Sequence, residues 1–61
     1  MEPPTVREVT RMLEKEGFKF VSQKGSHCKY SRDGRYVTIS GHPGKHLKWK
    51  TWYSIKKQAG L

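Results

Sequence analysis

The chain has 61 residues, of which 13 are Lys or Arg and five are Asp or Glu, so its formal net charge is +8 at pH 7. A chain this short supports one thin hydrophobic core, which excludes a separate substrate-binding domain, and we expect residues 1–61 to form a single domain. This excess of positive charge favours polyanionic partners, with nucleic acid ahead of acidic protein and anionic membrane.

The first predicted helix covers about Val6–Glu16. Thr5 and Glu8 have the three-residue spacing of a capping box, and the apolar residues that follow recur at helical spacing. Gly17 stands where a residue in the left-handed conformation commonly ends a helix. The pattern then changes to the short apolar run Phe18–Val21, which predicts a first strand.

Two further strands, His27–Ser31 and Tyr36–Ser40, are predicted to form a hairpin. The residues between them, Arg32–Arg35, contain an Asp-Gly pair, which is typical of a two-residue hairpin turn. Because side chains alternate between the two faces of a strand, Cys28 is expected to face the core and His27 to face away from it.

A last helix is predicted over about Thr51–Ala59. It follows the segment Gly41–Lys45, whose two glycines and one proline interrupt the strand pattern. Trp52 and Ile55 have helical spacing, and Gly60 stands at the expected end. The order helix, three strands, helix predicts an α+β fold in which both helices cover one face of a three-stranded antiparallel sheet.

The sequence also bears on compartment and on membrane binding. No apolar run approaches the roughly 20 residues that a membrane span needs, and the start MEPPTVRE lacks the pattern of a signal peptide. A single cysteine cannot form an internal disulfide, which indicates a reducing compartment. We therefore expect a cytoplasmic protein that does not bind membranes.

Cys28 raises two hypotheses that the sequence disfavours. As a nucleophile it would need a base, but His27 projects to the opposite face of the strand, and a half-buried cysteine is more often a small core residue. A zinc site would combine Cys28 with His42 and His46, and with His27 as a fourth ligand. The sequence has no C-x-x-C pair, and Pro43 prevents the helix that would align the two histidines. We predict no metal ligand here.

His27 is the more informative residue. It follows a Gly25-Ser26 turn and has Lys24 and Lys29 close to it in sequence. Beside bound RNA, its imidazole could take the proton of a 2′-hydroxyl, whose oxygen would then attack the adjacent phosphorus, and a lysine could stabilise the added charge. The alternative is a surface histidine that only contacts phosphate or water, which on composition alone is the more common case.

The C-terminal half offers further candidates. His42 could act as a second acid or base or as a phosphate contact, or could simply belong to a turn. His46 is expected to be solvent-exposed. Lysines and aromatic residues then alternate, which suits RNA because bases stack on rings while lysines hold phosphates. These residues are Lys45, Lys48, Lys50, Lys56 and Lys57 with Trp49, Trp52 and Tyr53. We expect Trp52 to pack in the core. The sequence makes no prediction about the burial of Trp49.

Four segments together resemble a known family. They are LEKEGF at 13–18, QKGSH at 23–27, HPGK at 42–45 and SIKKQAGL at 54–61. On these segments, which run nearly from end to end, the chain is similar to HicA-type toxins, the small mRNA interferases of bacterial and archaeal toxin–antitoxin pairs.

The resemblance implies a fold like that of a double-stranded-RNA-binding domain, endoribonuclease activity on mRNA without metal or other cofactor, and a HicB-type antitoxin that covers the site. The catalytic histidine of the family falls on His27, which favours the catalytic interpretation of this residue. The residues expected to support catalysis or bind RNA are Lys24, Gly25, Ser26, Lys29, His42 and Lys45. We expect the free protein to be monomeric. The alternative function is a non-catalytic RNA-binding domain of the same fold.

Overall fold

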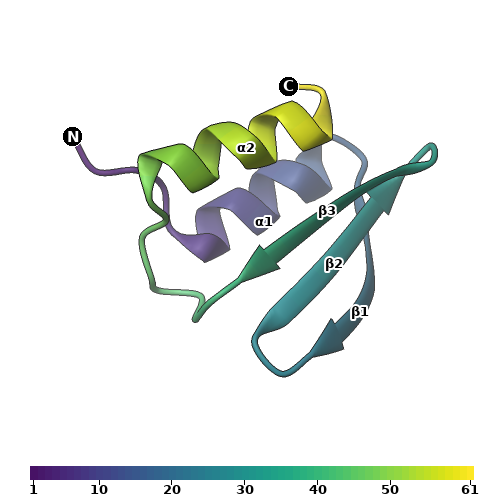
Figure 1. The fold of residues 1–61 in the computed structure, drawn as a ribbon. Helices are drawn as coiled ribbons and strands as arrows, with labels where there is room; N and C mark the ends of the chain where they lie inside the picture. The colour runs from purple at the N-terminus through teal and green to yellow at the C-terminus, as the bar shows by residue number, and fades with distance from the viewer.

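The computed structural model describes all 61 residues and contains two helices and three strands (Figure 1). The elements are α1 (Val6–Lys15), β1 (Lys19–Lys24), β2 (His27–Arg32), β3 (Arg35–Ser40) and α2 (Trp49–Ala59). The strands form one antiparallel sheet in the order β1-β2-β3, and both helices lie on the same side of it. The predicted α+β fold is therefore confirmed.

The capping box predicted for α1 is present. The Thr5 side chain accepts a hydrogen bond from the Glu8 N–H (3.2 Å), and the Glu8 carboxylate accepts one from the Thr5 N–H (2.8 Å). The helix ends at Lys15, one residue earlier than expected, because Glu16 is the capping residue. Gly17 follows with a φ of +95°, which few residues other than glycine adopt.

β1 is longer than predicted and begins one residue later, at Lys19 instead of Phe18. It continues to Lys24 because its connection to β2 is a two-residue loop, Gly25-Ser26, and Lys24 pairs with His27. Gly25 has a φ of +61°, the conformation that the first position of such a hairpin loop requires. The turn between β2 and β3 has the predicted Asp-Gly pair at its centre.

α2 begins at Trp49, two residues earlier than the predicted Thr51. Its N-terminal capping residue is Lys48, whose side chain makes no capping hydrogen bond, so the sequence lacks the usual signal for a helix start. The predicted end is correct, since Gly60 caps the helix in the left-handed conformation. Neither helix has the length and apolar character needed to cross a membrane.

The hydrophobic core lies between the helices and the two strands β2 and β3. Its ten buried residues are Val6, Val9, Leu13, Phe18, Tyr30, Val37, Ile39, Leu47, Ile55 and Ala59. β1 contributes none of them, because all six of its side chains are exposed. The β1 edge of the sheet is therefore left open on its helix side as well as on the opposite face.

Candidate nucleic-acid interface

His27 lies on the face of the sheet that the helices leave uncovered. Strand pairing places Lys24, His27 and Ser40 in one row across the three strands, and Lys29 lies in the next row beside Thr38. Directly paired residues point to the same face of a sheet. His27 is exposed, as the alternation along β2 predicts, and the lysines on both sides of it in sequence share its surface.

The same face carries an exposed aromatic ring. The Nζ atom of Lys29 lies 4.8 Å from the centroid of the Tyr36 ring, and the Tyr36 side chain is exposed. Lys19 belongs to this face too, since it pairs with Ser31, which pairs with Tyr36. None of the three strands contains Asp or Glu. The face can therefore hold phosphates with three lysines, and it carries both an imidazole and an aromatic ring on which a base can stack.

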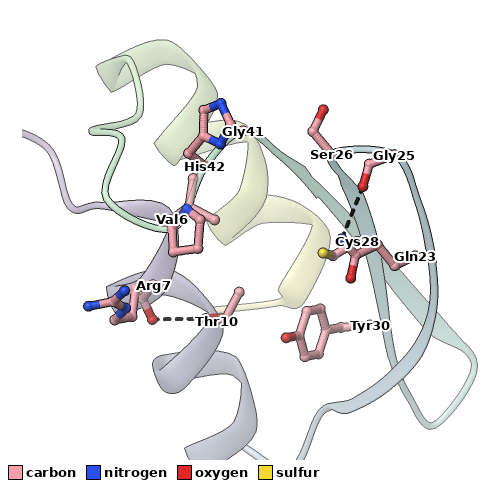
Figure 2. Close-up of a pocket in the computed structure, with 11 residues that line it drawn as sticks. Val6, Arg7, Thr10, Gln23, Gly25, Ser26, Cys28, Tyr30, Gly41 and His42 are labelled. Carbon is pink, nitrogen blue, oxygen red and sulfur yellow. Dashed lines mark hydrogen bonds between the residues drawn. The ribbon is translucent and has the colours of Figure 1, made fainter.

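The turn before His27 is anchored by two hydrogen bonds. The Gly41 N–H donates to the Ser26 carbonyl (3.1 Å), which ties the turn to the segment after β3. The Gln23 side-chain amide donates to the Gly25 carbonyl (3.0 Å; Figure 2). These bonds position the start of β2, and with it His27, relative to the end of β3.

A pocket of about 570 Å³ opens on the helix side of the same turn, between α1, the turn and the segment after β3. Gly25, Ser26 and His42 line it together with Cys28 (Figure 2), whereas His27 does not. The structure thus divides the predicted site residues. His27 and its two lysines lie on the open face, and the turn residues and His42 border the pocket.

Cys28 faces the core, as predicted. It is half-buried, packs against the hydrophobic cluster and pairs with Ile39, whereas His27 is exposed on the other face. The adjacent thiol and imidazole therefore do not form a nucleophile–base pair within β2. Tyr30, on the same side as Cys28, is buried, and this burial raises the pKa of its hydroxyl, which stays protonated near neutral pH.

In the segment that connects β3 to α2, Lys45 and His46 have different surroundings. Lys45 lines a smaller pocket of about 200 Å³ together with Ser40, the residue that pairs with His27. His46 is 46% exposed, but its Nδ1 donates to the Pro3 carbonyl (2.6 Å) and its Nε2 lies 3.0 Å from the Glu2 carboxylate. His46 therefore holds the N-terminal segment, a role that the sequence did not reveal because the contact spans more than 40 residues.

The zinc hypothesis receives no geometric support, since no three residues of the types His, Cys, Asp and Glu lie close enough together to hold one ion. Among the aromatic residues of the C-terminal half, Trp52 packs against the core as predicted. Trp49 is exposed and stacks on Tyr53, which settles the position that the sequence left open.

Comparison with known proteins covers almost the whole chain. Residues 6–61 match the family described as the HicA toxin of bacterial toxin–antitoxin systems. A curated relative from Pseudomonas fluorescens, named probable mRNA interferase HicA, is 37% identical over 54 residues, which span 88% of this chain and 90% of the relative. The family match includes the open face, the turn and the pocket.

Proposed function

The chain belongs to the HicA toxin family, and from this premise we propose that it is an endoribonuclease that cleaves mRNA. Three observations support the proposal. The named relative is a probable mRNA interferase, the chain carries a net charge of +8, and the uncovered face of the sheet combines lysines with an exposed histidine and no carboxylate. The last observation carries the proposal, because it supplies both a phosphate-binding surface and a proton acceptor.

We propose that His27 acts as the general base. It takes the proton of a 2′-hydroxyl, the 2′-oxygen forms a bond to the adjacent phosphorus, and the bond from phosphorus to the 5′-oxygen breaks. One fragment then ends in a 2′,3′-cyclic phosphate and the other in a 5′-hydroxyl. Because the nucleophile comes from the RNA itself, this chemistry needs no metal ion and no protein nucleophile.

Lysines adjacent to His27 would stabilise the extra negative charge at phosphorus. Lys24 pairs directly with His27 across β1 and β2, and Lys29 lies two residues further along β2 on the same face. Lys45 lies near Ser40, the residue of β3 that pairs with His27, and extends the basic surface along the RNA backbone. Gly25 and Ser26 form the turn that positions His27.

The 5′-oxygen that leaves must receive a proton, and His42 is our candidate for the acid. It lines the pocket beside Ser26 and does not share the surface of His27. For both imidazoles to act on one phosphate, the scissile phosphodiester has to lie at the end of the sheet where Ser26 and Gly41 meet. In an in-line reaction the 2′-oxygen and the 5′-oxygen flank the same phosphorus, so His27 would contact the 2′-hydroxyl and His42 the 5′-oxygen from opposite sides of that phosphate.

The partner that controls the toxin is proposed to be an acidic antitoxin of the HicB type. The matched family is defined as the toxin half of a pair, and an acidic partner fits the charge of this chain. The antitoxin would inhibit cleavage by covering the exposed lysines around His27.

A direct test incubates the purified protein with a long unstructured RNA in EDTA, beside the His27→Ala variant purified in the same way. We expect wild type to fragment the RNA and to leave cyclic phosphate ends that mass spectrometry detects. Intact RNA with wild type in EDTA but not in Mg²⁺ contradicts the metal-free step. Intact RNA in both EDTA and Mg²⁺ contradicts the proposed nuclease activity and favours a non-catalytic RNA-binding domain. Equal cleavage by wild type and His27→Ala contradicts the role of His27.

A further inference from the structure

The exposed side of α2 carries an aromatic pair that the core does not use. Trp49 and Tyr53 lie one turn apart, with ring centroids separated by 6.1 Å and ring planes inclined by 27°. Their side chains are 43% and 59% exposed, while Ile55 and Ala59 bury the opposite side of the helix. The two rings therefore remain available to a ligand.

Lysines of α2 flank this pair, and none of them forms an ion pair. Lys50 and Lys57 are three residues before and four residues after Tyr53, the spacings that bring side chains together on a helix surface. The Nζ atom of Lys56 lies 5.9 Å from the centroid of the Tyr53 ring. The chain contains no Asp or Glu after Asp33, and its one ion pair joins two residues outside α2. The positive charge of this surface is thus not neutralised within the protein.

The two features together indicate the kind of ligand. Lysines alone would suit any polyanion, but stacked rings with free surfaces suit unpaired bases, which stack on aromatic side chains while cations hold the backbone. The bases of a duplex are paired and are not available for such stacking. An acidic protein could neutralise the lysines without a specific use for two open rings, so the observations favour single-stranded nucleic acid.

We propose that the surface formed by Trp49, Lys50, Tyr53 and Lys57, here called the α2 surface, binds single-stranded RNA by stacking bases on its rings. The proposal rests on the proposed function for the identity of the nucleic acid. α2 lies on one side of the sheet (Figure 1), and His27 lies on the opposite, uncovered face. The α2 surface is therefore separate from the surface around His27. It would hold a flexible part of the substrate outside the cleavage site.

The test measures binding separately from cleavage. All proteins carry His27→Ala, and fluorescence anisotropy follows the binding of a labelled 12-nucleotide oligouridylate. We expect Trp49→Ala and Tyr53→Ala each to weaken binding by about fivefold to a hundredfold, the range for loss of one stacked base. Tyr53→Phe, which keeps the ring, should bind like its parent. Phe20→Ala removes an exposed aromatic residue of the β1 edge and serves as the control for nonspecific effects.

The lysines have a matched control as well. Lys57 and Lys15 are both in the last turn of a helix and both exposed, but only Lys57 lies on the α2 surface. Lys57→Ala should reduce the slope of log affinity against log salt by about 0.7, whereas Lys15→Ala should leave it unchanged. Circular dichroism would show whether each variant remains folded, and Tyr53→Phe tests the ring without removing its packing.

Two outcomes would overturn the inference. One is unchanged oligouridylate binding by the Trp49→Ala and Tyr53→Ala variants. If these variants also bind an acidic antitoxin less tightly, the α2 surface belongs to a protein interface. The other is equal weakening by Phe20→Ala. Failure of wild type to cleave RNA would contradict the proposed function instead, and the binding measurement would still be decided on its own result.

Discussion

At the residue scale, the neighbours His27 and Cys28 have separate roles because β2 turns them to opposite faces. The imidazole lies on a basic open surface, while the thiol packs against the core and lines the pocket. A nucleophilic cysteine is commonly activated by a base within hydrogen-bond reach, and His27 cannot provide it from the other face. We therefore propose that, of these two residues, only His27 takes part in the chemistry.

This separation predicts that Cys28→Ala leaves RNA cleavage within about twofold of wild type. The substitution removes one half-buried sulfur atom, so the free energy of unfolding should fall by about 1 kcal/mol or less. Cleavage assays and urea unfolding check the two parts. Loss of cleavage in a variant that remains folded would show that the thiol takes part in the reaction.

At the scale of secondary-structure elements, two side chains at the N-terminus of α1 accept hydrogen bonds from backbone N–H groups that have no partner within the helix. Thr5 and Glu8 form both halves of the capping box. Thr5→Ala should lower the free energy of unfolding by about 1 kcal/mol, as removal of a helix cap commonly does. Thr10→Ala is the matched control, since Thr10 lies inside the helix and its hydroxyl donates to the Arg7 carbonyl instead of capping the helix. An equal loss in both variants would contradict the role of the cap.

The same cap predicts a pH dependence. Hydrogen bonds from the Thr5 backbone and then from the Thr5 side chain hold the pKa of Glu8 below its ordinary value of 4.5. A carboxyl group whose pKa is lower in the folded state stabilises the protein above its unfolded pKa, and this contribution is lost as the pH falls through the folded pKa.

Wild type should therefore lose more stability than Glu8→Gln between pH 7 and pH 3. The amide still accepts a hydrogen bond from the Thr5 N–H but does not titrate, so the comparison isolates the carboxylate. Urea unfolding midpoints at the two pH values measure the difference. An identical decrease in both proteins would show that the Glu8 hydrogen bonds do not favour the ionised carboxylate.

At the scale of the whole molecule, local patterns predicted the elements but not their long-range contacts. The capping box, the Asp-Gly turn and the period of two along β2 were sufficient for the fold and for the exposure of His27. They could not show that His46 contacts Pro3, or that Lys24 continues β1, because these depend on the folded chain. The start of α2 was missed because no capping side chain marks it.

The split of the predicted site into two regions was also beyond the sequence. Gly25, Ser26 and His42 line one pocket because Ser40 pairs with His27 at the end of the sheet and the Gly41 N–H then bonds to the Ser26 carbonyl. Periodicity assigns a residue to a face, but it does not show which loops close over that face. The face on which His27 lies was therefore predictable from the alternation along the strand, but the placement of His42 at the pocket was not.

Charge distribution predicts a strong salt dependence of RNA binding. If three or more lysines from the open face and the α2 surface contact phosphates, the slope of log affinity against log salt should be about −2 or steeper. A change from 50 to 200 mM salt would then weaken binding of a single-stranded RNA roughly 20-fold. Anisotropy titrations measure the slope. An affinity that does not change with salt would exclude the lysines as the main RNA contacts.

Single-turnover kinetics can show whether His27 moves a proton during RNA cleavage or only contacts the RNA. With protein in excess over RNA and the RNA saturated, the observed rate reports the chemical step and not binding. We predict that His27→Ala slows this step by about 10²- to 10⁴-fold, the range for loss of a general base, and leaves RNA affinity within a few fold. A cleavage rate close to that of wild type, or a loss that saturating protein restores, would show that His27 only contacts the RNA.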